Sequence, residues 1–464
     1  MNKTKGVVTI QIGKGCRYYG LDEKTKEKIF SDLTYRNKKY DDAKRFGSYV
    51  SPNIPETIKY FAVSRDGSTI WSPRGYIWVI KKWLKRNNYK VKVDDRTLLL
   101  PKMDIEFKGK LRNYQEKAVN DVIRRYPIGV LEAATGAGKT CCAIAVIAKR
   151  KQPTLIICHT KELLYQWQGA IKQFLDYNCG LIGDGKYDVK SITVGIINTV
   201  KNNTEDLVNR FGHIICDEVH RVTSGTWSDT IVQFAARNYL GLSATPFRND
   251  GLSGAIYVHI GPKVHVIDKK MLHDTGKVLK PQIILIKTNF RAANNWAEEE
   301  KLSYTEIIKI LTMDETRNKI IVQAIYNDLK KNNENILVVS DRVSHLHTLS
   351  DMLSSIKIKN HLLSGKTKKE KRKQIIKDVR NNKCKVLIST LSLISEGFDS
   401  PNLSAIFLTT PVGYKGLAIQ AIGRILRPSK GKVPPRVFDF RDENVRVLKY
   451  SGFKRNKIYN EEWK

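Results

Sequence analysis

The sequence predicts an α/β protein in which two parallel-sheet domains stand in tandem behind a small α+β N-terminal domain. From about residue 111 onward, apolar runs of strand length alternate with helix-like stretches, in two successive sets. Continuous apolar runs of this length are typical of parallel sheets that helices cover on both faces. The first 108 residues lack this alternation and are denser in charge and in aromatic side chains.

The N-terminal segment, residues 1–108, carries 24 Lys and Arg against 12 Asp and Glu, which is +12 of the whole chain's +35. No acidic residue occurs between residues 67 and 93. The stretches VVTIQI and TIWSPRGYIWVI predict short strands, and WVIKKWLK predicts a helix. We therefore expect residues 1–108 to form a separate basic, aromatic-rich α+β module.

The two sets of apolar runs place the tandem domains. The first set predicts a domain over residues 109–250, with strands at 129–133, 154–158, 192–198, 213–217 and 239–243. The second set predicts a domain over residues 315–464, with strands at 335–340, 360–363, 386–390, 405–409 and 436–440. Residues 251–314 include a polar helix-like segment, and we expect them to be the linker.

Composition limits the class of protein. The 464 residues are 41% hydrophobic and 27% charged, enough to bury several cores. A net charge of +35 indicates a polyanionic partner. The chain has no apolar run of about 18 residues, and its seven Cys form no CxxC pair, which disfavours a zinc site or a disulfide framework. We expect a cytoplasmic monomer without a membrane partner, in the host cytoplasm if a phage encodes it.

The strongest local signal is ATGAGKT at residues 134–140, between the apolar run IGVLEA and the helix-like CCAIAVIAKR. Strand, loop and helix in this order are what a phosphate-binding loop requires, because small residues let backbone N–H groups approach the phosphates. Ala133 stands where the usual first glycine would be. Lys139 is expected to reach the β- and γ-phosphates of ATP, and Thr140 to hold Mg²⁺. The expected nucleotide-binding residues are Thr135, Gly136, Ala137, Gly138, Lys139 and Thr140.

Asp217 and Glu218 follow the apolar run HIIC, at a strand end where α/β sheets present ligand-binding groups. Asp217 would complete the Mg²⁺ site, and Glu218 would orient and deprotonate the attacking water. The alternative is an acidic helix N-cap pair.

Two arginines in the second domain, Arg424 and Arg427, are three residues apart and would share a helix face. They could stabilise the charge on a departing γ-phosphate if the second domain closes on the nucleotide. The alternative is a solvated basic face of the helix.

Taken in their order along the chain, the motifs resemble those of superfamily-two helicases, and they extend across almost all of residues 111–428. LRNYQ, at residues 111–115, is similar to the adenine-recognising motif, which implies nucleotide contacts for Arg112 and Gln115. SAT, at residues 243–245, resembles the motif that couples hydrolysis to nucleic-acid binding, which implies that role for Ser243 and Thr245. EGFD, at residues 396–399, resembles the motif that implies nucleotide contacts for Gly397 and Asp399. QAIGRILR, at residues 420–427, resembles the motif that assigns a coupling role to Gln420.

Within that superfamily, the segments LRNYQEKAV, LLYQW and GLSATPFRNDG resemble the XPB-like and UvsW-like DNA helicases, most of all a phage branch-migration helicase. This resemblance implies two tandem RecA-like domains and an ATP-dependent DNA helicase or translocase. Its substrates would be branched DNA and single-strand/duplex junctions, in replication, recombination or repair. Two alternatives remain: an RNA or R-loop helicase, with RNA–DNA hybrids as partner, and a nucleic-acid binding or annealing factor that ATP switches.

The same resemblance places nucleic-acid contacts at ends of predicted strands, where hydroxyls, backbone N–H groups and basic side chains can hold phosphates. The expected contacts are Thr160, Lys161, Thr199, Ser340, Arg342, Ser364, Lys366 and Thr390. Helix capping is the alternative for each Ser and Thr. In the N-terminal module, a basic helix face is expected to bind DNA through Lys81, Lys82, Lys85 and Arg86. The aromatic side chains there could form a core or stack on unpaired bases.

Overall fold

The computed structural model describes residues 5–45, 49–134, 136–223, 225–244, 251–274, 276, 278–395, 402–411, 415–426 and 432–463. The chain forms two compact units, Met1–Ala134 with Gly138–Lys269 and Thr135–Ala137 with Lys270–Lys464. Among the described helices, none is long and apolar enough to cross a membrane.

The first unit begins with the predicted α+β module, built on a five-stranded sheet in the order β5-β6-β2-β1-β7. Its strands are β1 (Lys5–Ile12), β2 (Cys16–Tyr19), β5 (Ala62–Val63), β6 (Ile70–Ser72) and β7 (Tyr89–Asp95). Its helices are α1 (Glu23–Leu33) and α3 (Ile77–Arg86), and a short 3-10 turn, η1 (Arg74–Tyr76), precedes α3. Leu33 of α1 and Leu84 of α3 share one apolar core with Ile10 of β1. A second pairing, β3 (Thr34–Arg36) with β4 (Thr57–Lys59), carries α2 (Lys38–Arg45) between its strands.

The rest of the first unit is a sheet of eight strands in the order β11-β10-β12-β9-β13-β14-β8-β15. The strands are β8 (Ile128–Ala133), β9 (Thr154–Cys158), β10 (Gly180–Gly183), β11 (Lys186–Asp188), β12 (Ile192–Ile196), β13 (His213–Cys216), β14 (Asn238–Ser243) and β15 (Lys263–Ile267). Every pairing is parallel except that of β11 with β10. Every residue of β8, β9, β13 and β14 is buried, which is why each reads as an unbroken apolar run.

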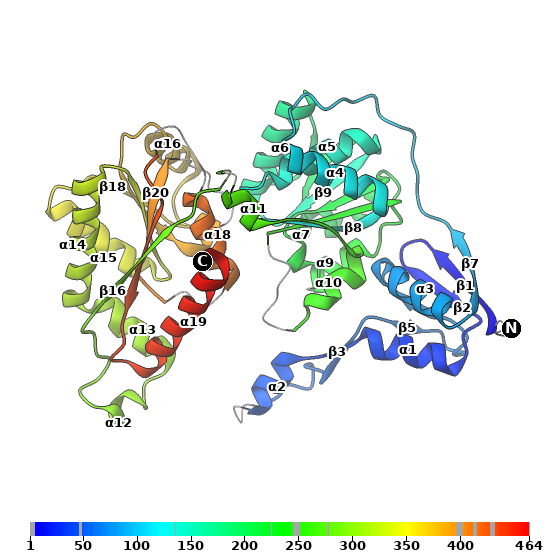
Figure 1. Ribbon diagram of the computed structural model, residues 1–464, viewed down its shortest axis with the longest axis horizontal. Helices are drawn as coiled ribbons and strands as arrows, with labels where there is room; N and C mark the ends of the chain where they lie inside the picture. Colours follow the sequence, from blue (N-terminus) through cyan, green and yellow to red (C-terminus); the bar gives the residue numbers. More distant parts are fainter. Residues whose placement is uncertain are drawn as a thin grey trace. The chain divides into compact units, whose positions relative to one another are not determined.

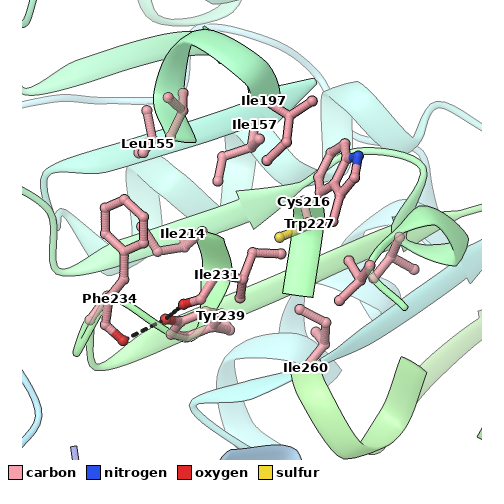
Figure 2. Packing of buried hydrophobic residues seen from close by; sticks show 14 of the residues in the cluster. Leu155, Ile157, Ile197, Ile214, Cys216, Trp227, Ile231, Phe234, Tyr239 and Ile260 are labelled. Carbon is pink, nitrogen blue, oxygen red and sulfur yellow. Dashed lines mark hydrogen bonds between the residues drawn. The ribbon is translucent and has the colours of Figure 1, made fainter. Parts of the chain in front are cut away.

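Helices connect these strands and cover the sheet. They are α4 (Asn113–Arg125), α5 (Lys139–Arg150), α6 (Lys161–Leu175), α7 (Ile197–Asn202), α8 (Thr204–Leu207), α9 (Gly225–Ile231) and α10 (Ser253–Ile260), with a 3-10 turn η2 (Val219–Arg221). On one face, side chains of β9 and β13 pack against α9 and the chain beyond it (Figure 2). The Tyr239 hydroxyl donates to the carbonyls of Ile231, at 3.1 Å, and Phe234, at 2.9 Å, and so fastens the end of α9 to the sheet.

The second unit contains a sheet of six strands, all parallel, in the order β16-β21-β20-β17-β19-β18. Its strands are β16 (Gln282–Lys287), β17 (Asn335–Ser340), β18 (Asn360–Leu363), β19 (Val386–Thr390), β20 (Leu403–Leu408) and β21 (Arg436–Arg441). The described helices are α11 (Lys269–Asp274), α12 (Trp296–Glu299), α13 (Tyr304–Met313), α14 (Glu315–Asn332), α15 (Val343–Ser355), α16 (Lys369–Arg380), α17 (Leu391–Ser395), α18 (Lys415–Ile425) and α19 (Arg446–Trp463). Helices α14 and α15 lie on one side of the sheet, and α18 and α19 on the other (Figure 1).

The expected linker, residues 251–314, instead contributes strands to both sheets. Strand β15 pairs with β8 in the first sheet, and β16 pairs with β21 in the second. Both are edge strands. In β15 only Val264 and Ile267 are buried, and His265 interrupts its apolar residues, unlike the continuous apolar run of a central parallel strand. The apolar run IILI of β16 was a strand signal that the sequence prediction missed. The first domain therefore continues past residue 250.

Another difference concerns residues 192–198. Strand β12 ends at Ile196, and helix α7 begins at Ile197. The apolar run continues because Ile197 and Val200 of α7 are buried under the sheet.

Candidate active site

The phosphate-loop sequence joins the end of β8 to the start of α5. Gly136 and Gly138 have φ angles of 87° and 85°, in the left-handed region that favours glycine. Thr140 lies half-buried in the first turn of the 12-residue helix α5. A loop with this backbone, followed by the N-terminal N–H groups of a helix, fits a triphosphate. Thr135 lies outside the described residues.

Gln115 of α4 contacts this loop directly. A Cβ atom added to Gly138 would overlap the Gln115 side-chain amide nitrogen. The backbone N–H of Arg112 donates to Gln115 Oε1 at 2.9 Å and orients the amide. The Arg112 guanidinium meanwhile contacts the Tyr114 hydroxyl at 3.0 Å. The structure thus brings Gln115, predicted from the adenine-recognising motif, against the phosphate loop.

Asp217 lies just past the end of β13, with 8% of its surface exposed. Its Oδ1 accepts the Glu218 backbone N–H at 3.0 Å, and its Oδ2 accepts the Trp167 indole N–H at 2.9 Å. Burial raises the pKa of Asp217 above its ordinary value, and the Glu218 carboxylate acts in the same direction. The Trp167 hydrogen bond and the charge of Lys139 oppose that rise in pKa. A buried carboxylate is a ligand type that Mg²⁺ prefers, so Asp217 fits a divalent cation.

Glu218 has a φ of 53°, an uncommon left-handed conformation for a residue with a side chain. Strain of this kind often occurs at functional sites. Its Oε2 lies 3.3 Å from His220 Nδ1, so the carboxylate is held beside an imidazole. Lys139 donates from Nζ to the carbonyl of Ala133 at 3.1 Å, which directs its ammonium back over the loop.

Ser243 is buried at the end of β14 and pairs in register with Glu132 of β8, one residue before Ala133. Ser243 therefore lies on β14, the strand next to β8, which leads into the phosphate loop. Thr245 lies outside the described residues.

Two family models match the chain: Type III restriction enzyme, res subunit, over residues 108–248, and Helicase conserved C-terminal domain, over residues 299–429. The DNA 3'-5' translocase XPB2 of Sulfurisphaera tokodaii is 27% identical over 71% of this chain and 81% of its own length. The probable helicase D10 of Escherichia phage T5 is 26% identical over 80% of each chain.

Two solved structures are also similar. The Pyrococcus furiosus Hef helicase domain aligns with a TM-score of 0.52 and 16% identity, over 74% of this chain and 98% of its own, which supports the fold. The T4 UvsW crystal structure aligns over 98% of this chain and 97% of its own, at 20% identity and a TM-score of 0.43.

The two matched models together with these relatives place the chain among the superfamily-two helicases, and within them it is similar to the XPB2 translocase. The helicase is therefore an ATP-hydrolysing enzyme that binds nucleic acid, and the prediction of two tandem RecA-like domains is confirmed.

In the second RecA-like domain, Gln420 and Arg424 lie on α18. Arg427, Gly397 and Asp399 lie outside the described residues, so the shared helix face of the two arginines stays a prediction.

In the first domain of the helicase, the expected nucleic-acid residues lie near helix starts. Thr160 caps α6, where its hydroxyl accepts the Leu163 N–H at 3.3 Å, and Lys161 beside it is exposed. Thr199 is half-buried within α7, not directly after a strand.

In the second domain, Ser340 is buried, and its hydroxyl bonds to His345 Nδ1 at 3.0 Å and accepts the Arg342 N–H at 3.2 Å. The Ser340 hydroxyl is thus used inside the protein, although the N-cap residue of α15 is Arg342. Arg342 and Lys366 are exposed, whereas Ser364 is buried at the end of β18. Thr390 ends β19 and is half-buried.

In the N-terminal module, Lys82, Lys85 and Arg86 are exposed on α3, and the half-buried Lys81 places its ammonium 5.8 Å from the Trp78 ring centroid. Many of the aromatic side chains form core, as for Tyr18 and Tyr76. Tyr49, in contrast, is 84% exposed.

Two residues of consequence were not predicted. Trp167 holds the Asp217 carboxylate, and Arg74 ties the N-terminal module to the motor domain. Trp167 lies within LLYQW, a segment used only for its family resemblance, and Arg74 had no distinguishing local pattern.

Proposed function

We propose that this helicase is a DNA translocase that acts on branched DNA, by fork regression, branch migration or unwinding. The observation that carries the proposal is the firm attachment of a strongly basic module to the first motor domain. A motor whose DNA-binding module is fixed to it can hold a duplex arm while it draws a strand from the junction.

The attachment centres on Arg74 of η1. Its guanidinium donates to the carbonyl oxygens of Ala236 and, at 3.2 Å, Arg237, and lies 4.9 Å from the Tyr239 ring centroid. The next residue, Gly75, is so close to α10 that a Cβ atom would overlap the carbonyl of Tyr257. The module and α10 are therefore in direct backbone contact at this point.

The segment that leaves the module, residues 96–112, is also bound along the motor domain. The Leu98 N–H donates to the Ala235 carbonyl at 2.7 Å, and Gln152 bonds to both the N–H and the carbonyl of Leu100, at 2.9 and 2.8 Å. Further along, the Lys108 N–H donates to the Phe174 carbonyl at 2.7 Å. The connection is therefore a bound strap and not a free tether.

The nucleotide chemistry follows from the site of the first domain. Bound Mg²⁺ would compensate the charge of the phosphates, with Thr140 and Asp217 as its protein contacts. Lys139 would hold the phosphates, Gln115 and Arg112 the base, and Glu218 would orient the attacking water. Gly397 and Asp399 would add nucleotide contacts. Arg424 and Arg427 would stabilise the transition state when the second domain closes. The coupling of hydrolysis to nucleic-acid binding would depend on Ser243, Thr245 and Gln420.

The nucleic acid would cross both domains through phosphate contacts that carry no sequence information. The proposed contacts are Thr160, Lys161, Thr199, Ser340, Arg342, Ser364, Lys366 and Thr390, with Lys81, Lys82, Lys85 and Arg86 in the N-terminal module.

ATP-dependent processing of matched substrates tests the proposal: a tailed duplex, a fork, a Holliday junction, an R-loop and an RNA duplex. We expect the fork and the Holliday junction to be processed fastest, with Lys139→Ala inactive on every substrate while still binding DNA. Fastest processing of the RNA duplex or R-loop would favour the RNA alternative. Strand annealing without ATP hydrolysis would favour the ATP-switched binding factor.

The role of the module is tested by removing three charges from α3, with Lys82, Lys85 and Arg86 replaced by Ala. We expect junction binding to weaken and its log–log salt slope to fall by about 2–3, with single-strand-stimulated ATPase nearly unchanged. The matched control replaces Lys14, Lys90 and Lys92, three exposed lysines of the same module, by Ala. Equal weakening by the control set would mean that only overall charge matters.

A further inference from the structure

We infer that Trp167 is a positioning residue through which nucleic acid bound at the start of α6 acts on the Mg²⁺-binding carboxylate Asp217. The inference rests on the proposed roles of Asp217, Thr160 and Lys161, and it adds the physical connection between them. All four residues belong to the first unit.

The first link is a side-chain hydrogen bond. Trp167 Nε1 donates to Asp217 Oδ2 at 2.9 Å, and only 1% of the Trp167 surface is exposed. An indole N–H can only donate a hydrogen bond. The bond therefore holds Asp217 Oδ2 toward α6 and leaves the opposite side of the carboxylate open. Asp217 Oδ1 is held separately by the Glu218 N–H at 3.0 Å.

The second link is through the backbone. The Asp217 N–H donates to the carbonyl of Ile157 on β9, at 3.0 Å. Strand β9 ends at Cys158, and Thr160 caps α6 two residues later. Asp217 is therefore bonded on one side to the strand that leads into α6, and on the other to α6 itself.

The third observation is how α6 is held between its first turn and Trp167. Leu164, Trp167, Ile171 and Leu175 are buried on one face, and Thr160 caps the first turn. Trp167 lies fewer than two helical turns from Lys161. A phosphate that displaces the start of α6 therefore moves the indole with it, and with the indole the Asp217 carboxylate.

The other buried tryptophan of this domain provides a comparison. Trp227 of α9 is 4% exposed and packs in the apolar cluster beneath the sheet (Figure 2). Replacing either indole by a phenyl ring removes similar bulk from the same domain. Only Trp167→Phe removes the donor to Asp217.

The test measures ATPase of the full chain, with and without single-stranded DNA, over a Mg²⁺ titration, together with the Mg²⁺ dependence of binding of a non-hydrolysable ATP analogue by isothermal titration. For Trp167→Phe we expect the half-saturating Mg²⁺ concentration to rise by about tenfold. At saturating Mg²⁺, we expect DNA stimulation of kcat to fall severalfold, with KM for ATP changed by less than about twofold. Trp227→Phe should match the wild type in both, and Trp167→His, which keeps a ring N–H, should recover part of the response.

The inference is overturned if folded Trp167→Phe, judged by circular dichroism and thermal unfolding, keeps the wild-type Mg²⁺ response and DNA stimulation. It is also overturned if Trp227→Phe loses both to the same degree, because general loosening of the core would then explain the result. Failure of the proposed function has a different signature: a wild-type protein with DNA-stimulated ATPase but no preference for branched substrates.

Discussion

Gln115 packs against Gly138 so closely that a methyl group on that glycine would overlap the glutamine side-chain amide. The contact joins α4 to the phosphate loop and places Gln115, 23 positions upstream, beside the proposed nucleotide site. Gly138 should therefore be sensitive to substitution for two separate reasons: the nearby Gln115 side chain and its own φ of 85°.

Gly138→Ala should weaken ATP binding by more than about tenfold, because the loop must leave the left-handed conformation or displace Gln115. Isothermal titration with a non-hydrolysable ATP analogue measures this directly. Gly169→Ala on α6 is the control, since nothing lies within 4 Å of the added methyl group. Unchanged affinity in Gly138→Ala would show that the loop tolerates a side chain.

Arg74→Ala should destabilise the attachment of the N-terminal module by about 1–3 kcal/mol, because the carbonyl of Ala236 would lose its buried donor. Limited proteolysis should then cut within residues 96–112 faster than in the wild type. Arg96→Ala removes an exposed arginine that pairs with Asp94, and it should leave the cleavage rate near the wild-type value. Equal protection of Arg74→Ala would count against a rigid attachment.

Arg317→Met should lower the free energy of unfolding of the second unit by about 3–5 kcal/mol, because Asp442 would be left buried without its partner. The two side chains are 1% and 2% exposed, and Arg317 Nε lies 2.7 Å from Asp442 Oδ1. Denaturant unfolding measures the loss. Arg446→Ala, which breaks an exposed pair with Glu300 at 3.7 Å, should cost less than about 1 kcal/mol.

Acid should destabilise the second unit through His345. Burial lowers the pKa of His345 to about 3, and the charge of Arg317 acts in the same direction. Below about pH 6.5, His345 therefore binds a proton in the unfolded state but not in the folded state. Stability attributable to His345 should fall by up to about 1.4 kcal/mol per pH unit from pH 6.5 toward pH 3.

The measurement is the slope of unfolding free energy against pH in His345→Gln, which should be smaller than in the wild type. His347→Gln, on the exposed face of the same helix, should keep the wild-type slope. Equal slopes in all three proteins would remove His345 as the source.

Sequence patterns were sufficient wherever structure depends on neighbours along the chain. The central strands β9 and β17 have the bounds that their apolar runs predict, because both faces of each are buried. The edge strands β15 and β16 were missed, because polar residues interrupt the apolar residues of β15 and the short run IILI of β16 lies in the segment expected to be the linker. The phosphate loop could be predicted for the same local reason, as its function depends on the order of strand, glycine-rich turn and helix.

By itself, the sequence determined the fold class, the helicase family and the residues proposed to handle ATP, because these depend on short motifs and on hydrophobic periodicity. Only the tertiary structure decided that Trp167 holds Asp217, that Arg74 fixes the basic module, and that the Ser340 hydroxyl is used inside the protein. Trp167 and Asp217 are 50 positions apart, and Arg74 and Ala236 are 162 apart. Contacts of this range form only when segments distant in sequence pack together in the folded chain, so no local pattern encodes them.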